Sequence, residues 1–117
     1  MGTREIIQGY FAELQQRGRW ESFLADDLKF TSFTSPPKEV AGKATYLEST
    51  RRFFSMIQSI AVRDLIVEGE QACALTRYQL QAPSGTTFQS DVAELFRVRN
   101  GNIVALAIYF DSAPFPK

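Results

Sequence analysis

The side chains that could do chemistry centre on one carboxylate in the second half of the chain, Glu94. Strand-like alternation places it on one face with Ser90, Val92, Phe96 and Val98, and places Asp91, Ala93, Leu95, Arg97 and Arg99 on the other face. A carboxylate among apolar neighbours loses hydration when it ionises, so we expect its pKa to rise unless a cation or several donors reach it. A carboxylic acid of this kind can donate a hydrogen bond to a developing enolate or act as a general acid.

Two structural roles for Glu94 compete with this chemical role. The carboxylate could pair with an arginine of a neighbouring strand, such as Arg77, or it could simply hold Tyr10 in place. Tyr10 is the second candidate for chemistry, because a buried phenol needs a partner and a ligand carbonyl would serve. Its neighbour Phe11 competes for the same inward position, and further phenols come from Tyr46, Tyr78 and Tyr109.

Several residue types that carry catalysis or bind metals are absent or rare. The chain has no histidine, which excludes the commonest general base, the Ser-His and Cys-His nucleophile pairs and most zinc sites. The single cysteine, Cys73, cannot form an internal disulfide, and we interpret it as a small buried hydrophobe in a strand. Asp26 and Asp27 are adjacent, but no further carboxylate follows at ligand spacing. We therefore expect neither a metal nor an organic cofactor.

The composition limits the class of protein. A chain of 117 residues predicts a single domain over residues 1–117, and a hydrophobic share of 44% with ten phenylalanines suits an interior cavity or a large interface. Thirteen basic and thirteen acidic residues give a net charge of zero, without the basic excess of a nucleic-acid-binding protein. No apolar stretch approaches the length of a membrane helix, and no signal core opens the chain, so we expect a cytoplasmic location.

The apolar spacing changes from helical to strand-like near residue 58. The first part predicts three helices: an amphipathic one over residues 4–17, a short one through Trp20, Phe23 and Leu24 that Asp26-Asp27 ends, and one after Gly42-Lys43. A first strand through Leu28, Phe30 and Ser32 lies between the last two and ends at Ser35-Pro36-Pro37. Later strands are predicted over residues 60–67, 72–81, 86–99 and 102–111, with a tight turn at Asn100-Gly101.

This order of elements predicts an α+β fold. Three N-terminal helices would pack on a strongly curved, mostly antiparallel sheet to form a cone-like body, because strands of ten or more residues must twist and coil. Such a body encloses a pocket suited to a small ligand, with Trp20 closing its narrow end. The outward face of the long strands carries Ala93, Leu95, Ala105 and Ala107, so we expect a homodimer through this outer face.

Several short motifs in one order resemble the nuclear transport factor 2-like superfamily, close to its SnoaL-like (polyketide cyclase-like) and ketosteroid isomerase-like branches. These motifs are Tyr10-Phe11, Gly18-Arg19-Trp20, the segment 24–30, Gly42-Lys43, the segment 96–103 and Tyr109-Phe110-Asp111. The resemblance implies a conical α+β domain that is often a dimer. It leaves the activity open, because the superfamily includes isomerases, cyclases, dehydratases, epoxide hydrolases and non-catalytic modules.

The family's catalytic residues map onto this chain only in part. The aspartate base of ketosteroid isomerase-like members falls on Ser32, and their oxyanion tyrosine falls on Phe11. Their second, protonated oxyanion acid falls on Glu94, which is the one chemically sensible match. The epoxide hydrolase-like aspartate falls on Ile108, and the histidines of dehydratases and SnoaL-like cyclases are missing.

The resemblance also predicts which residues line the pocket. In addition to Glu94 and Tyr10, they are Phe11, Phe30, Ser32, Phe54, Val92, Phe96, Leu106, Ile108 and Phe110. Such a pocket predicts a small, mainly apolar ligand. The leading hypothesis is isomerase- or cyclase-type acid-base chemistry on a carbonyl compound, with Glu94 as acid or base and Tyr10 as hydrogen-bond donor. The alternative is a non-catalytic dimerisation or ligand-sensing module.

Overall fold

The computed structural model describes residues 2–34 and 38–115. Two α-helices, α1 (Thr3–Gln15) and α2 (Lys43–Met56), and one short 3-10 turn, η1 (Trp20–Phe23), accompany six strands. The strands are β1 (Leu24–Ser32), β2 (Lys38–Ala41), β3 (Ile57–Glu68), β4 (Gln71–Gln81), β5 (Thr87–Arg99) and β6 (Asn102–Phe110). The predicted α+β class is confirmed.

The number of helices and the start of the first strand differ from the prediction. The segment through Trp20 and Phe23 is a four-residue 3-10 turn, so the described chain has two α-helices rather than three. Asp26 and Asp27 do not end a helix; they lie exposed within β1, which already begins at Leu24. Aromatic and apolar spacing cannot separate one helical turn from the first residues of a strand when the run is this short. The predicted break at residues 35–37 lies outside the described residues.

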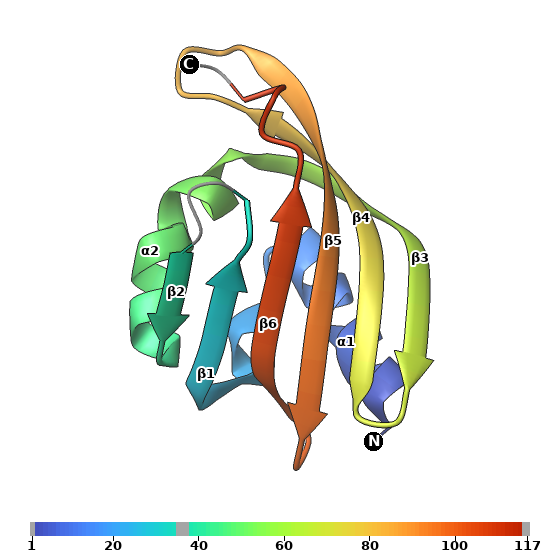
Figure 1. The fold of residues 1–117 in the computed structure, drawn as a ribbon. Coiled ribbons are helices and arrows are strands. Elements are labelled where there is room, and N and C mark those ends of the chain that lie inside the picture. The colour runs from blue at the N-terminus through green and yellow to red at the C-terminus, as the bar shows by residue number, and fades with distance from the viewer. Residues whose placement is uncertain (1, 35–37, 116–117) are drawn as a thin grey trace.

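The six strands form one sheet in the order β2-β1-β6-β5-β4-β3. All neighbours are antiparallel except β1 and β6, which run parallel. The ladders shift register within the β3–β4, β5–β6 and β1–β6 pairs, and such bulges bend the strands and increase their twist. Both α-helices lie on the same side of the resulting curled sheet (Figure 1).

The hairpin turn between β5 and β6 shows why the sequence folds back where it does. Asn100 and Gly101 have positive φ values of 53° and 82°, which suits the two central residues of a type I′ turn. The predicted tight turn is therefore confirmed. It sets β6 antiparallel to β5, with Val98 opposite Ile103 and Glu94 opposite Ile108.

The core lies between the concave face of the sheet and α1. The buried face of α1 carries the predicted apolar residues Ile6, Ile7, Tyr10, Phe11 and Leu14. Tyr10 and Phe11 both meet Phe96 of β5 edge-on, with ring centroids 5.7 and 5.8 Å apart. Trp20 is partly buried and packs on Phe54 of α2 at 4.5 Å between ring centroids. These rings fill the interior between α1 and the middle of β5.

Candidate functional site

A cavity of about 200 Å³ lies between the concave face of the sheet, α2 and the C-terminal segment. Seven aromatic residues line it: Phe30, Tyr46, Phe53, Phe54, Tyr78, Phe110 and Phe115. The remaining lining residues are Ser32, Lys38, Ser49, Thr50, Ser90, Val92, Glu94 and Ile108. Glu94 lies deep in the fold, whereas Lys38 is exposed at the start of β2. The cavity is therefore an apolar space with one buried acidic group in its wall.

Glu94 is held in β5 by two hydroxyl groups of the neighbouring strand β4. Its side chain is 4% exposed, and its Oε2 atom accepts hydrogen bonds from Thr76 Oγ1 at 2.6 Å and Tyr78 OH at 2.7 Å. The β4–β5 register places Thr76 opposite Val92, so both donors project from the same face as the carboxylate. No ion pair to Glu94 occurs within the described part of the chain.

The protonation of Glu94 follows from this setting. Burial raises the pKa of Glu94 from its usual 4.5 to about 7, although the hydrogen bonds from Thr76 and Tyr78 oppose part of the rise by stabilising the anion. Both the acid and the carboxylate are therefore populated near neutral pH. A group of this kind can accept a proton and return it within one reaction cycle.

Thr76 can satisfy Glu94 in both protonation states. Its Oγ1 atom lies 2.6 Å from Glu94 Oε2 and 3.1 Å from the carbonyl oxygen of Val92, but a hydroxyl carries only one proton. When Glu94 is ionised, Thr76 donates to the carboxylate. When Glu94 is protonated, it can donate to Thr76, whose own proton then turns to Val92. Neither state leaves a buried donor of this pair without an acceptor.

A group of buried tyrosines surrounds the carboxylate. Tyr10 of α1 donates a hydrogen bond to the hydroxyl of Tyr46 on α2. Burial, followed by the nearby charge of Glu94 and of other tyrosines, raises the pKa values of Tyr10 and Tyr78 well above the usual value. Burial and Glu94 likewise raise the pKa of Tyr46. These three phenols are neutral hydrogen-bond donors at physiological pH.

Ser90 is the buried polar side chain that lacks a hydrogen-bond partner among the residues the structure describes. Its side chain is 1% exposed, and its Oγ atom makes no hydrogen bond in the described part of the chain. It lies in the cavity wall on β5, four residues before Glu94 and opposite Tyr78 in the ladder. Native proteins rarely leave a buried hydroxyl without a partner, so this group is free to bind a ligand atom.

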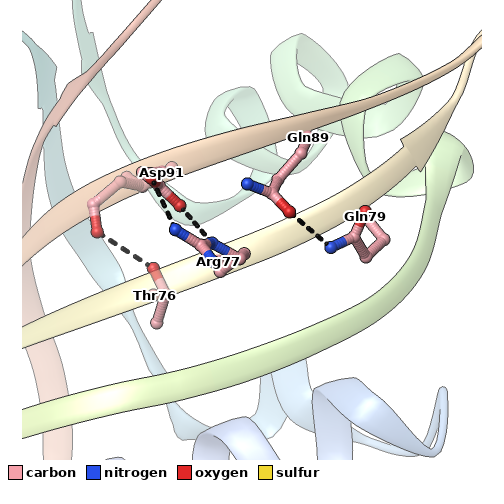
Figure 2. Close-up of polar contacts among 6 residues, drawn as sticks. Thr76, Arg77, Gln79, Gln89 and Asp91 are labelled. Atoms are coloured by element: carbon pink, nitrogen blue, oxygen red, sulfur yellow. Dashed lines mark hydrogen bonds and ion pairs between the residues drawn. The ribbon is translucent and has the colours of Figure 1, made fainter.

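The structure brings only some of the sequence-predicted residues to the cavity. Those in its wall are Glu94, Phe30, Ser32, Phe54, Val92, Ile108 and Phe110. Tyr10, Phe11, Phe96 and Leu106 are buried in the core instead, where the aromatic contacts of α1 with β5 fill the space. The suggested Glu94–Arg77 pair is wrong, because Arg77 points to the opposite face and its guanidinium binds Asp91 at 2.8 and 3.2 Å (Figure 2).

Thr76, Tyr78 and Ser90 are the site residues that the sequence prediction did not assign a role. Strand alternation already placed Ser90 on the face of Glu94, and the same alternation in β4 puts Thr76 and Tyr78 on one face. Only the β4–β5 register shows that their hydroxyls reach Glu94. The sequence therefore indicated which side chains share a face of each strand, but it did not indicate which side chains of the two strands touch.

Two further searches concern metals and membranes. Among residues 2–34 and 38–115, no three Cys, Asp or Glu side chains gather in a way that could hold a metal ion. The helices within the same residues are too short or too polar to cross a bilayer.

Comparison with known proteins identifies the family. The family model of the SnoaL-like domain matches residues 7–106. The chain belongs to the SnoaL-like family. A search of curated proteins finds no match to this SnoaL-like chain.

Solved structures place this SnoaL-like domain in the nuclear transport factor 2-like (NTF2-like) fold. An NTF2-like protein from Burkholderia thailandensis is 16% identical, with 97% of this chain and 94% of that chain covered and a TM-score of 0.83. A protein assigned as a SnoaL-like polyketide cyclase, from Jannaschia, is also 16% identical, with 98% and 93% covered and a TM-score of 0.78. A hypothetical protein with a ketosteroid isomerase-like fold from Catenulispora acidiphila, in complex with trimethylamine, is 17% identical, with 94% and 88% covered and a TM-score of 0.76. At these identities the likeness concerns the fold.

Proposed function

We propose that this SnoaL-like domain binds a small, mainly apolar carbonyl compound in its cavity and moves a proton on it through Glu94. The observation that carries the proposal is a buried carboxyl group in the cavity wall whose pKa is about 7 and which has no cationic partner in residues 2–34 and 38–115. Perturbed acids of this kind gather at catalytic sites, because a general acid-base group works best when its pKa lies near the ambient pH. The SnoaL-like polyketide cyclase and ketosteroid isomerase-like neighbours are consistent with this class of chemistry.

The proposed step is proton transfer next to a carbonyl group. Ionised Glu94 takes a proton from the carbon beside the carbonyl; the C–H bond breaks, and its electron pair passes into an enolate. Protonated Glu94 then returns the proton to carbon, either at the same position or at a conjugated one, so no oxidant or reductant is needed. Because the three buried tyrosines stay neutral, Glu94 is the group of the tyrosine–glutamate cluster that titrates near neutral pH.

The competing function is a non-catalytic ligand-binding module. Ser32 and Phe11 at the family's base and oxyanion positions favour it. The two functions differ in whether bound ketones exchange hydrogen with solvent. Acid-base chemistry predicts that the wild-type protein speeds exchange of the α-hydrogens of simple ketones in D₂O, and that Glu94→Gln abolishes the increase.

The first experiment joins a titration to that exchange assay. Carboxyl-carbon NMR gives the pKa of Glu94, with Glu94→Gln assigning the signal, and proton NMR follows exchange in acetone, cyclohexanone and acetophenone. Asp91→Asn is the matched control, because Asp91 lies on the other face of the same strand in an exposed pair with Arg77. A pKa near 7 with exchange lost only in Glu94→Gln supports the proposal. A pKa near 4.5, or exchange unchanged by Glu94→Gln, overturns it.

We also propose that a second copy of the chain covers the outer face of the sheet, the face turned away from the helices. The strand registers align two neighbouring rows of mostly apolar residues across it. One row contains Ile66, Cys73, Leu95 and Ala107; the other contains Leu75, Ala93 and Tyr109, with Phe33 stacked on the tyrosine ring. Leu75, Leu95, Ile66, Phe33 and Tyr109 are all exposed in the single chain. Contiguous apolar surface of this kind is typical of an interface.

Charge on this outer face fits a second copy of the same chain. The Arg77–Asp91 pair (Figure 2) is next to the row of Leu75 and Ala93 in the β4–β5 ladder. A two-fold axis can therefore bring an arginine of one copy near an aspartate of the other. Analytical ultracentrifugation at about 10–100 μM, the range of moderate affinity, tests this. We expect a dimer for the wild type and for Ser55→Arg on α2, and a monomer for Leu95→Arg. A wild-type monomer throughout would refute the dimer.

A further inference from the structure

We infer that the ligand of this cavity is a neutral compound of a single ring, whose oxygen atom accepts a hydrogen bond from Ser90. This inference rests on the proposed function for the choice of cavity and adds the size, charge and polarity of the ligand. It depends on three features: the volume, the arrangement of polar groups along β5 and the absence of a buried cation among the wall residues that the structure describes.

The volume limits the ligand to about one ring. Apolar engineered cavities of about 150 Å³ bind benzene, and pockets for drug-sized ligands measure about 300–1,000 Å³. At about 200 Å³, this cavity is larger than a benzene-binding cavity and smaller than a pocket for a drug-sized ligand. It can enclose a substituted six-membered ring, but not the four fused rings of a steroid.

The polar groups of β5 define how such a ring lies. Ser90, Val92 and Glu94 alternate along one face of the strand, and all three line the cavity. Ser90 and Glu94 are therefore separated by roughly 13 Å of strand, with the apolar Val92 between them. Tyr78, the residue opposite Ser90, reaches Glu94 Oε2 with its hydroxyl, so the carboxyl group leans along the strand towards Ser90. A ligand whose oxygen accepts from Ser90 therefore lies over Val92 with the carbon beside its carbonyl group turned towards Glu94.

Ser90 carries the recognition of the oxygen atom. Each hydroxyl and carboxyl of the Thr76–Tyr78–Glu94 group already has a protein partner, and Tyr10 is bound to Tyr46. Ser90 Oγ, in contrast, is fully buried and has no partner in the described residues. A ligand carbonyl supplies the missing acceptor, and binding then removes the cost of an unsatisfied buried hydroxyl.

The charges of the wall favour a neutral ligand. An anion entering the cavity meets the buried carboxyl group of Glu94. Among the described residues, the one cationic side chain of the wall is Lys38, which is exposed and solvated at the start of β2. A cation loses its hydration among the aromatic side chains of the wall, and Glu94, with a pKa of about 7, carries only part of a negative charge near neutral pH to offset that loss. A neutral ring with one polar atom enters without either desolvation cost.

The test compares ligands that differ in one property at a time. Binding is followed by proton–nitrogen NMR titrations of the wild type and of Ser90→Ala. The reference ligand is acetophenone, and ethylbenzene is the same kind of ring without the oxygen. Benzoate tests an anion, tetramethylammonium a cation and progesterone a four-ring ketone. We expect acetophenone to bind, and Ser90→Ala to weaken it about threefold to tenfold, the loss typical of one neutral hydrogen bond. Ser90→Ala should leave ethylbenzene binding unchanged. Benzoate, tetramethylammonium and progesterone should bind more weakly than acetophenone or not at all.

The outcomes separate this inference from the proposed function. If acetophenone binding depends on Ser90 but no ketone shows Glu94-dependent exchange, the ligand class stands and the catalytic proposal fails. If exchange depends on Glu94 while acetophenone fails to bind, or if a charged or four-ring compound binds best, the ligand class is wrong. Equal effects of Ser90→Ala on acetophenone and ethylbenzene would mean that the substitution acts on packing, which also overturns the role of Ser90. The melting temperature of unliganded Ser90→Ala, expected to equal or exceed that of the wild type, checks that the variant folds.

Discussion

Replacing Glu94 by glutamine should stabilise the protein at alkaline pH and leave its stability almost unchanged at acid pH. The reason is that the folded state holds Glu94 in a setting that favours the acid, with a pKa of about 7 against 4.5 for the usual, solvated group. Between these two values the folded chain binds more protons than the unfolded chain, so its free energy of unfolding falls as the pH rises. Below pH 4.5 both states are protonated at Glu94, and the group then carries no penalty.

The magnitude follows from the width of that window. Each unit of pKa difference corresponds to about 1.4 kcal/mol, so the wild type should lose about 3 kcal/mol through Glu94 between about pH 4.5 and pH 7. Glutamine resembles the neutral acid, since its amide oxygen can replace Oε2 and accept hydrogen bonds from both Thr76 and Tyr78. Glu94→Gln should therefore be more stable than the wild type by up to about 3 kcal/mol at pH 8 and nearly equal at pH 4.5.

Urea unfolding at a fixed protein concentration, measured at half-unit steps from pH 4.5 to pH 8.5, checks this prediction. Asp91→Asn is the matched control. The exposed Asp91 is paired with Arg77, which lowers its pKa, so its removal should not flatten the fall in stability between pH 5 and pH 7. Parallel stability curves for the wild type and Glu94→Gln would refute the reasoning, because they would mean that Glu94 has the same pKa in the folded and unfolded chains. The other residues facing Glu94 (Tyr10, Tyr46 and Tyr78) and the nearby Cys73 have raised pKa values and do not titrate in this window.

Three further predictions concern single side chains. Thr76→Val removes a hydrogen-bond donor to ionised Glu94. Because a hydrogen bond to a charged group contributes about 1.5–3 kcal/mol, the pKa of Glu94 should rise by about one unit or more in a carboxyl-carbon titration. An unchanged pKa would contradict the hydrogen bond. Leu28→Ala, at a fully buried position, should cost about 2–5 kcal/mol in urea unfolding, and a loss below 1 kcal/mol would mean that the site is not in the core. Gly101→Ala should cost about 1–2 kcal/mol because φ is 82° there, whereas a neutral result would exclude the type I′ turn.

Local patterns in the sequence determined most of the secondary structure and the faces of the elements. The spacing of Ile6, Ile7, Tyr10, Phe11 and Leu14 predicted α1 and its buried side, and the residues at 100 and 101 predicted the last hairpin turn. Alternation in β5 placed Glu94 on the buried face, because side chains of a strand point to opposite sides in turn. These features depend on neighbours within a few residues, which a sequence displays directly.

Short or irregular segments were harder to predict. The edge strand β2 (Lys38–Ala41) has only four residues, and no alternation is visible over so short a length. The segment from Trp20 to Leu24 reads equally well as a helix, and only its pairing with β6 makes Leu24 part of a strand. In both cases the hydrogen-bonding partner lies far away in the chain and outweighs local propensity.

The side-chain contacts that give Glu94 its chemical properties were decided by the tertiary structure alone. The sequence determined that a lone carboxylate lies on the apolar face of a strand in a chain without histidine. It did not determine that Thr76 and Tyr78 reach Glu94, that Arg77 turns away to Asp91, or that Tyr10 pairs with Tyr46. Strand register and the packing of helices on the sheet set these distances, and both depend on residues far apart in the chain.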